Sequence, residues 1–198
     1  MGREVYHLAS RCSTTNNFII KGFLDDGNPN LNEFSFNYPP LLGNISDYQI
    51  EDNDVFACSI GDVKAKAKII DYMEAKGAEF VSLIDPSAYI ERTASIDYGA
   101  LIFHDVHVGS EAIIGRHVML QSYSAIGHDV IIGDYTRIDP KVSCVGGTKI
   151  GNCVTLHTMS FINHKVRIGD GATIGAMSMV IRSVKSGTTV FGIPAKEL

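Results

Sequence analysis

Residues 108–133 read VGSEAIIGRHVMLQSYSAIGHDVIIG, and every sixth residue of this stretch, counted from Val108, is aliphatic. The same spacing runs without an insertion from Ile84 to Val180, where only Cys144 is not Ile, Leu or Val. A period of six fits neither the 3.6 residues of a helical turn nor the two-residue alternation of a strand. It is typical of a parallel β-helix built from hexapeptides, in which three short strands close each triangular coil of the chain.

The period assigns a role to each position of the repeat. The aliphatic residue is expected to point into the prism. The residue four places later is small throughout, as at Ala112, Val118 and Ser124, and is expected to fill a corner that a larger side chain would overpack. Glycine often follows the aliphatic residue, as at Gly109, which suits a tight backbone. An ordinary β-sandwich is disfavoured because loops of variable length would lose the phase.

Residues 1–82 have a different rhythm and predict a small α/β domain that precedes a β-helix over residues 83–198. The expected elements are a helix over 4–10, a strand over 18–24, a loop-rich stretch over 28–54, a strand over 54–60, a helix from an N-cap at Asp62 to about residue 76, and a strand over 79–84. Strands that alternate with helices predict a parallel sheet.

Ligands bind at the carboxyl ends of the strands in sheets of this kind. Asp25, Asp26 and Gly61 stand at such ends and are therefore candidate substrate-binding residues. A solvated β-turn is the competing interpretation of Asp25 and Asp26, because Asp-Asp-Gly also makes a turn well.

The composition is that of a soluble globular protein, and its formal net charge of −5 argues against general nucleic-acid binding. We find no signal peptide, no lipidation motif and no apolar run long enough to span a membrane. The four cysteines lack the spacing of a metal site or of a disulfide framework. These features predict a cytoplasmic protein with free thiols and without a metal ion.

Two of the seven histidines share the pattern His-x-Val-x-Ile-Gly, namely His128 and His164. They are 36 residues apart, which is two full coils, so the period predicts that they lie in one column with Gly146 between them. Histidine titrates near neutrality and is the natural base for removing a proton from an attacking amine or hydroxyl group. His128 is the better candidate because Asp129 follows it, whereas Lys165 follows His164; a plain surface residue of a coil is the competing interpretation of both.

The sequence resembles the NeuD/PglD-type sugar O-/N-acyltransferases of bacterial sialic acid and bacillosamine biosynthesis over nearly the whole chain, because six markers occur in the same order. Besides the hexapeptide array, the markers are Gly2-Arg-Glu-Val5, Gly22-Phe-Leu-Asp-Asp26, Ser59-Ile-Gly61, Ile126-Gly-His-Asp-Val130 and Gly192-Ile-Pro-Ala-Lys196. The resemblance implies a Rossmann-like domain that binds a nucleotide sugar, a left-handed β-helix that binds acetyl-CoA, and a homotrimer with acetyl-CoA between subunits. Family members usually begin with a strand and a glycine-rich loop ahead of the Gly-Arg-Glu-Val stretch. This sequence starts at that stretch, so we expect the sheet to lack its first, central strand.

The resemblance also implies roles for individual residues. It makes His128 the general base, with Asp129 in a position that is usually Glu. It assigns acetyl-CoA contacts to Arg137, Gly146, Thr158, Gly175 and Ala176, with the Gly146 amide on the thioester carbonyl. Lys196 is a candidate for a coenzyme phosphate, and plain coil packing is the competing interpretation for Thr158 and Ala176. The expected reaction is the N-acetylation of an amino sugar, carried on a nucleotide, by acetyl-CoA.

Three alternatives stay open at this point. The first is O-acetylation of a sugar hydroxyl group, as on sialic acid. The second is a non-enzymatic β-helix that serves as a trimeric scaffold or an ice-binding surface, which the mixed and charged outward positions disfavour. The third is a γ-type carbonic anhydrase, whose zinc needs three histidines across a subunit boundary, with His128, His157 and His164 as the candidates.

Overall fold

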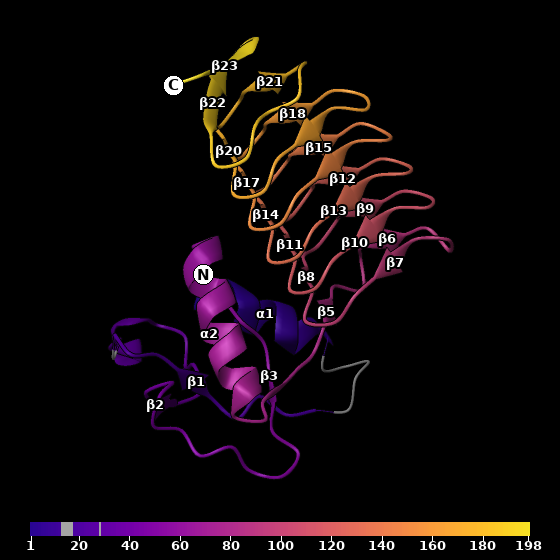
Figure 1. Ribbon diagram of the computed structural model, residues 1–198. Helices are drawn as coiled ribbons and strands as arrows, with labels where there is room; N and C mark the ends of the chain where they lie inside the picture. The colour runs from indigo at the N-terminus through magenta and orange to yellow at the C-terminus, as the bar shows by residue number, and fades with distance from the viewer. Residues whose placement is uncertain (13–17, 28) are drawn as a thin grey trace.

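The computed structural model describes residues 1–12, 18–27 and 29–198, and its larger part is a β-helix of stacked triangular coils (Figure 1). Residue 28, the first of the expected loop-rich stretch, lies outside the described residues. Each coil takes eighteen residues, since Ile113 pairs in parallel with Ile131 and Ile131 with Lys149. This is the architecture that the six-residue period predicts, and the predicted fold class is confirmed.

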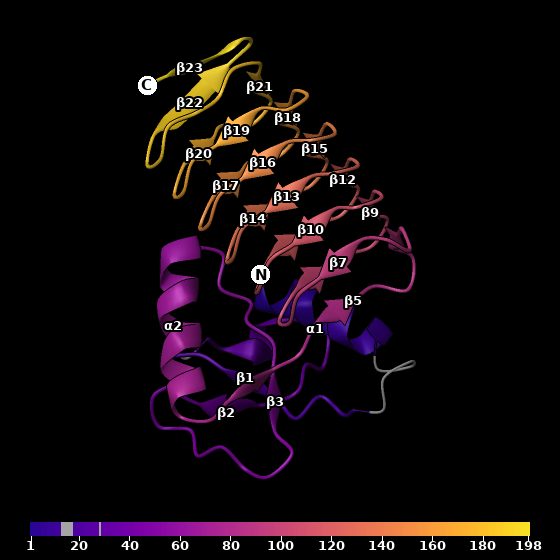
Figure 2. The ribbon, with the colours of Figure 1, turned by 45° about the vertical axis from the view of Figure 1, so that its right-hand side comes forward.

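Three parallel sheets form the faces of the prism (Figure 2). The eight-stranded face consists of β5 (Leu83–Ile84), β8 (Leu101–Ile102), β11 (Met119–Leu120), β14 (Arg137–Ile138), β17 (Thr155–Leu156), β20 (Thr173–Ile174), β22 (Thr189–Gly192) and the antiparallel β23 (Ala195–Glu197). The six-stranded face consists of β6 (Tyr89–Ile90), β9 (His107–Val108), β12 (Ala125–Ile126), β15 (Ser143–Cys144), β18 (Phe161–Ile162) and β21 (Met179–Val180). The five-stranded face consists of β7 (Ser95–Ile96), β10 (Ile113–Ile114), β13 (Ile131–Ile132), β16 (Lys149–Ile150) and β19 (Arg167–Ile168).

The interior of the prism contains the side chains that the repeat predicts. Ile126, Ile138 and Leu156 are fully buried, and Cys144 is buried among them, where desolvation raises the pKa of its thiol to about 12. The small residues of the corners from Ala100 to Ser178 are buried as well. The first aliphatic residues, such as Ile84, are only partly buried because no earlier coil covers them.

The glycines that follow the aliphatic residues are required by the close approach of adjacent coils, whereas the sequence suggested that they serve a tight backbone turn. A Cβ atom on Gly127 would lie 2.7 Å from the Gly146 nitrogen of the next coil, so the close approach of two backbones excludes a side chain there. The left-handed backbone position comes two residues later and is occupied mostly by other residue types, including Asp129 with a φ of 57° and Tyr135 with 60°.

The N-terminal part has the expected helices but shorter strands. Helix α1 (Gly2–Cys12) extends the expected helix at both ends, and α2 (Val63–Ala75) begins at the predicted N-cap, where the Asp62 carboxylate accepts a hydrogen bond of 2.7 Å from the Ala65 amide. The strands are β1 (Phe23–Leu24), β3 (Val55–Phe56) and β4 (Glu79–Phe80), while the end of the predicted 79–84 strand is β5 of the β-helix. The predicted loop also contains a short 3-10 helix (Leu31–Glu33) and β2 (Leu41–Gly43).

The predicted single parallel sheet is present as two separate pairs. β1 pairs with β2, β3 pairs with β4, both in parallel, and the two pairs are not hydrogen-bonded to each other. Each pair contains only two or three residues per strand, so the strands are shorter than the apolar runs indicate.

The two helices attach the N-terminal part to the β-helix. Val5, Leu8 and Ala9 of α1 pack on Leu101 and Met119 of the eight-stranded face. Neither α1 nor α2, the α-helices of the described residues, is long and apolar enough to cross a membrane.

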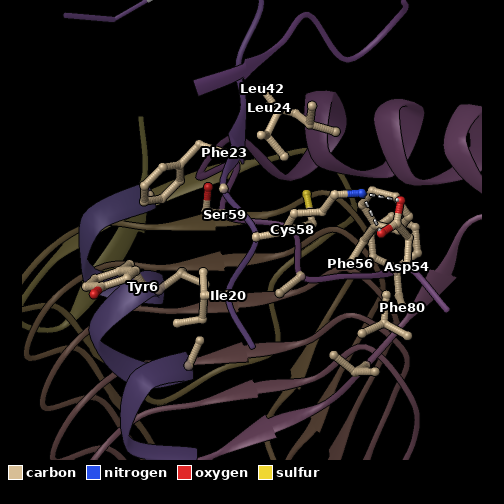
Figure 3. Close-up of a pocket in the computed structure, with 18 of the residues that line it drawn as sticks. Tyr6, Ile20, Phe23, Leu24, Leu42, Asp54, Phe56, Cys58, Ser59 and Phe80 are labelled. Atoms are coloured by element: carbon tan, nitrogen blue, oxygen red, sulfur yellow. Dashed lines mark hydrogen bonds and ion pairs between the residues drawn. The ribbon is translucent and has the colours of Figure 1, made fainter. Parts of the chain in front are cut away.

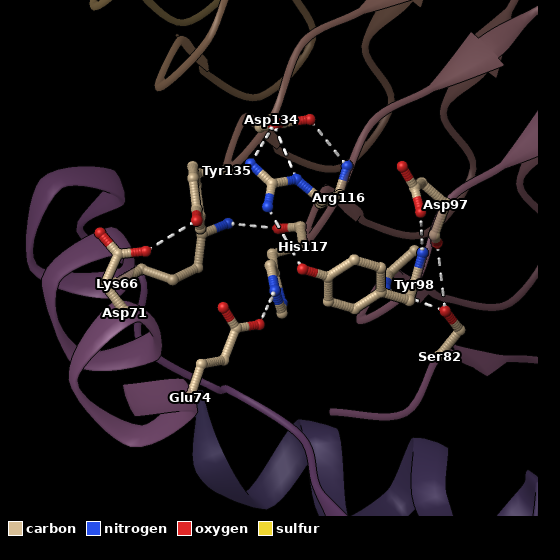
Figure 4. A network of polar contacts seen from close by, with 11 residues as sticks. Lys66, Asp71, Glu74, Ser82, Asp97, Tyr98, Arg116, His117, Asp134 and Tyr135 are labelled. Carbon is tan, nitrogen blue, oxygen red and sulfur yellow. Dashed lines mark hydrogen bonds and ion pairs between the residues drawn. The ribbon is translucent and has the colours of Figure 1, made fainter. Parts of the chain in front are cut away.

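Helix α2 lies along a corner of the coils through polar contacts (Figure 4). The Lys66 ammonium group donates a hydrogen bond of 2.8 Å to the His117 carbonyl, and His117 Nε2 lies 3.2 Å from Glu74. The Tyr135 hydroxyl group donates to Asp71 over 2.9 Å. Burial lowers the pKa of His117 and lowers the pKa of Lys66 to about 8. The contact between α2 and the β-helix therefore buries Lys66 and His117, whose protonated forms are destabilised by desolvation.

Candidate active site

The corner after β12 presents His128 to solvent. Ile126 and Val130 on either side of it are fully buried, which fixes the backbone of the corner. The side chain of His128 is 65% exposed, and the left-handed conformation of Asp129 brings the carboxylate back to the ring, with 2.6 Å between His128 Nδ1 and Asp129 Oδ2. A carboxylate at this nitrogen favours a proton on Nδ1 and leaves Nε2 as an acceptor. The dyad thus directs an unprotonated nitrogen away from Asp129.

The imidazole ring of His128 lies over Gly146. A Cβ atom at position 146 would lie 2.4 Å from His128 Nε2, so only glycine leaves the ring in this place. The strand register agrees with the predicted column, because Ala125 pairs with Ser143 and Ser143 with Phe161. His164 is therefore one coil beyond Gly146.

The backbone at Gly146 and Gly147 is hydrogen-bonded to the neighbouring coils. The Gly146 carbonyl accepts a hydrogen bond of 3.3 Å from the Lys165 amide, and the next residue, Gly147, donates one of 2.9 Å to the His128 carbonyl. Within the described part of the chain, the Gly146 N–H makes no backbone hydrogen bond. A potential base and a hydrogen-bond donor thus share this corner, which is what acyl transfer from a thioester requires.

Arg137 and Gly61 meet at a different place in the molecule. Arg137 extends from β14 on the eight-stranded face, and its Nη1 atom donates a hydrogen bond of 3.1 Å to the Gly61 carbonyl. β12, which leads to His128, belongs to the six-stranded face. Two of the predicted site residues, Gly61 and Arg137, are therefore in contact within one chain. They lie on a different face of the prism from His128.

A buried carboxylate that the sequence analysis missed organises this second place. Asp139 is only 5% exposed and contacts Arg137 Nε at 2.6 Å, Gln121 Nε2 at 3.1 Å and His157 Nδ1 at 2.9 Å. Gln121, Asp139 and His157 are spaced by one coil, so the eighteen-residue register was the signal that could have found them. His157 and Asp139 form another histidine–carboxylate pair, beside Arg137.

The remaining predicted coenzyme residues lie toward the C-terminal end of the coils. Thr158 and Ala176 share a column, and the Thr158 carbonyl accepts a hydrogen bond of 2.9 Å from Met177. Phe191 covers Gly175, where a Cβ atom would lie 2.4 Å from the ring, so packing alone accounts for this glycine. Lys196 is exposed on β23 and pairs across the hairpin with Phe191.

Asp25 and Asp26 both have structural partners. Asp25 accepts a hydrogen bond of 2.8 Å from the Gly27 amide, as in the turn that competed with a sugar-binding role. Asp26 accepts one of 2.7 Å from the Ile45 amide and so fixes the chain after β2. Substrate binding by these two residues stays a prediction.

The three histidines of the carbonic-anhydrase alternative do not come together in one chain. His128 contacts Asp129, and His157 contacts Asp139 on another face. In the part of the chain that the structure describes, no three or more His, Cys, Asp and Glu side chains form a group that could hold a metal ion.

Residues 111–144 match the bacterial transferase hexapeptide (six repeats) family. Comparison with curated proteins finds no significant match. Among solved structures, the acetyltransferase domain of PglB from Neisseria gonorrhoeae, in complex with acetyl coenzyme A, superposes with a TM-score of 0.90 at 24% identity. The superposition covers 100% of this chain and 94% of that domain.

Two further structures share the whole architecture. PerB from Caulobacter crescentus, in complex with CoA and GDP-perosamine, has a TM-score of 0.89 at 20% identity over 100% of this chain and 92% of its own. WeeI from Acinetobacter baumannii has a TM-score of 0.86 at 25% identity over 98% and 94% of the two chains. The chain thus contains bacterial transferase hexapeptide repeats and has the fold of the hexapeptide β-helix acetyltransferases, which confirms the predicted resemblance at this level.

Proposed function

We propose that the protein is an acetyl-CoA-dependent acetyltransferase that N-acetylates an amino sugar, with His128 as the general base. The observation that carries the proposal is the His128–Asp129 pair held over Gly146, with Nε2 free of the carboxylate. The fold supports it, because structures of the same architecture are a PglB acetyltransferase domain with acetyl coenzyme A and PerB with CoA and GDP-perosamine.

The reaction follows from the chemistry of the corner. The sugar amine attacks the thioester carbonyl carbon, a C–N bond forms, and His128 Nε2 takes the proton that the nitrogen loses. Asp129 stabilises the resulting imidazolium ion. The Gly146 N–H donates to the oxyanion until the C–S bond breaks and CoA leaves as the thiol, which carries away the proton. No covalent enzyme intermediate is required.

Acetyl-CoA is assigned to the long axis of the prism. Its thioester would lie at Gly146, and its pantetheine arm would follow the column of Thr158 and Ala176. The coil end beyond them is basic and includes Lys196, which suits the phosphates of the coenzyme. Arg137, held by Asp139, supplies a fixed guanidinium group for the acceptor or the coenzyme.

A homotrimer would complete the site. Within one chain His128 and the Arg137–Gly61 pair lie on different faces, and in a ring of three copies the corner of one copy can face the N-terminal part of its neighbour. The nucleotide sugar would then reach His128 from the neighbouring subunit, with Asp25, Asp26 and Gly61 as candidate contacts.

The test is free-thiol release from acetyl-CoA with a panel of nucleotide-linked amino sugars and with free sialic acid. The wild type is compared with His128→Ala, and acetyl-CoA binding is measured for both by calorimetry. We expect turnover with an amino sugar, a loss of at least about a hundredfold in the variant, and unchanged binding of acetyl-CoA. Full turnover by His128→Ala would overturn the assignment of the base, and turnover only with sialic acid would establish O-acetylation instead.

A further inference from the structure

The prism has three corners, and α2 covers one of them. Helix α2 contacts His117 and Tyr135 at the corner between the five- and eight-stranded faces. The other two corners border the six-stranded face. One bears His128, and the other, called the Thr158 corner here, comprises residues 104–105, 122–123, 140–141, 158–159 and 176–177. Along the coils that α2 covers, these two corners are the ones left exposed to another copy.

The left-handed positions of the Thr158 corner change in character along the prism. All five are exposed and have φ values between 54° and 62°, and in chain order they are Asp105, Tyr123, Lys141, Met159 and Met177. The two methionine side chains are 50% and 63% exposed. Such flexible apolar side chains suit the pantetheine arm that is assigned to this corner. The acidic and aromatic end of the row suits a different ligand.

His104 holds the two side chains at that end. Its Nδ1 atom lies 3.1 Å from Asp105 Oδ2, and its ring meets the Tyr123 ring edge to face, with 5.0 Å between the centroids. The side chains of Asp105 and Tyr123 are 50% and 55% exposed. A carboxylate beside an aromatic ring matches an amino sugar, because the ammonium group pairs with the carboxylate and the C–H groups of the sugar pack on the ring.

A cavity of about 660 Å³ in the N-terminal part is not suited to a cationic group (Figure 3). Its lining is mostly apolar and includes Tyr6, Phe23 and Phe56. The charged residues of the lining, Lys21 and Asp54, contact each other over 3.1 Å. The ammonium group of an amino sugar therefore needs a counter-charge elsewhere.

Symmetry places the acidic end of the Thr158 corner at the height of the base. Rotation about a three-fold axis parallel to the prisms leaves every height unchanged. Tyr123 precedes His128 by five residues in the same coil, so Tyr123 of a neighbouring copy would be level with His128. Asp105 lies one coil, about 4.8 Å, closer to the N-terminal part. Met159 lies beyond Gly146, on the opposite side of the thioester.

We propose, on the basis of the proposed acetyl transfer, that the Thr158 corner of one copy faces the His128 corner of the next, and that its Asp105 and Tyr123 bind the amino sugar. An amine is largely protonated near neutral pH, whereas a sugar hydroxyl group is uncharged. Asp105 therefore favours an amino sugar over an acceptor that offers only hydroxyl groups. His104 is a positioning residue, and binding at this corner adds no covalent step.

The first experiment compares the wild type with Asp105→Asn, because Asn tolerates the left-handed backbone but lacks the charge. We expect the KM for the amino sugar to rise at least about tenfold, while the affinity for acetyl-CoA, measured by calorimetry, stays the same. Asp52→Asn removes the same charge from an exposed position of the N-terminal part and should keep the wild-type KM. An unchanged KM in Asp105→Asn would overturn the sugar contact. A wild type without turnover on any acceptor would overturn the proposed function, and this contact with it.

Mixed oligomers show which copy supplies the contact. His128→Ala is co-expressed with the double variant Asp105→Asn, Tyr123→Asn, and proteins that carry both affinity tags are purified. We expect about one third of the wild-type rate of thiol release, because each mixed trimer has one interface at which both corners are intact.

The matched control co-expresses His128→Ala with Asp129→Asn. Both changes lie on the His128 corner, so no interface is intact and the rate should not exceed that of the two variants alone. Mixed oligomers of the test pair that are no more active than this control, or a failure of the two tagged chains to co-purify, would overturn the assignment of Asp105 and Tyr123 to the neighbouring copy.

Discussion

At the scale of single residues, the site depends on two contacts of His128: one with Asp129, the next residue in the sequence, and one with Gly146, one coil further along the β-helix. Asp129 reaches His128 because the corner places it in the left-handed region, and Gly146 accommodates the ring because it has no side chain. Both features could be predicted, the first from adjacency and the second from the eighteen-residue register. Asp139 was missed because no local motif marks its contacts, although the eighteen-residue register relates it to Gln121 and His157.

Gly146→Ala is expected to impair the proposed reaction without unfolding the β-helix. The added methyl group would occupy the place of His128 Nε2, so the ring has to rotate away from the Gly146 amide. We expect thiol release to fall at least about tenfold, because a displaced base costs productive geometry. The control is Gly77→Ala, whose added methyl group meets no atom within 4 Å. Because Gly77 has a φ of 92°, the cost of this backbone strain is measured as the change in its thermal midpoint and subtracted. Gly109→Ala is not used, because its methyl group would lie 2.8 Å from backbone atoms. Normal turnover by Gly146→Ala would contradict the placement of the base.

Asp129→Asn tests the carboxylate separately. An amide cannot carry the negative charge that stabilises the imidazolium ion, so we expect kcat to fall by about tenfold or more while the apparent affinity for acetyl-CoA stays the same. Asp129→Glu should restore part of the rate, since it returns the charge on a longer side chain. Equal activity of the Asn and Glu variants would show that Asp129 acts only through the shape of the corner.

At the scale of elements, hexapeptide strands were predictable because each one is fixed by the same two buried positions. The extents of the strands in the N-terminal part were not, because an apolar run does not show how many of its residues pair with a neighbouring strand. Residues 18–24 and 54–60 thus give only two paired residues each, β1 and β3. The α2 helix was predictable from its cap and apolar stripe. Its polar contacts with the β-helix were not, because Lys66 and His117 are 51 residues apart in the sequence.

The burial of Lys66 between α2 and the β-helix predicts how the free energy of unfolding depends on pH. Burial lowers the pKa of Lys66 from 10.5 to about 8, so between these values the unfolded chain binds a proton that the folded chain does not. Stability therefore rises with pH from about 8 to 10.5 and carries a constant penalty below this window. In Lys66→Met this contribution is absent. We expect the difference in free energy of unfolding between the two proteins to change across the window by at most about 3 kcal/mol.

Chemical denaturation of the wild type and Lys66→Met at matched pH values checks the prediction. Cys58 and Cys153 are replaced by serine in both proteins, because burial raises the pKa of each thiol while the charge of Lys66 lowers it, and their titration would not cancel in the difference. A difference that stays constant from pH 8 to 10.5 would show that Lys66 keeps its ordinary pKa and that α2 does not bury its charge.

At the scale of the whole molecule, the fold leaves apolar side chains outside the prism. Ile113 and Ile131 on the five-stranded face are 48% and 36% exposed, and Phe161 on the six-stranded face is 36% exposed. These faces flank the corner that bears His128, whereas α1 and the N-terminal part cover the start of the eight-stranded face. The six-residue period fixes which residues point outward, but not which outward face meets another copy, because that depends on the shape of the complete prism.

The proposed homotrimer predicts that assembly and activity fail together. Ile113→Glu combined with Ile131→Glu places two charges on adjacent coils of the five-stranded face, where burial against another copy would leave them unpaired. We expect light scattering to give the mass of a monomer and thiol release to fall at least about tenfold, while the far-ultraviolet circular dichroism of the β-helix is unchanged. Ile19→Glu, at a side chain that is 91% exposed in the N-terminal part, is the matched control and should stay trimeric. A monomeric wild type with full turnover would contradict the shared site, because it would place His128 and every acceptor contact within one chain.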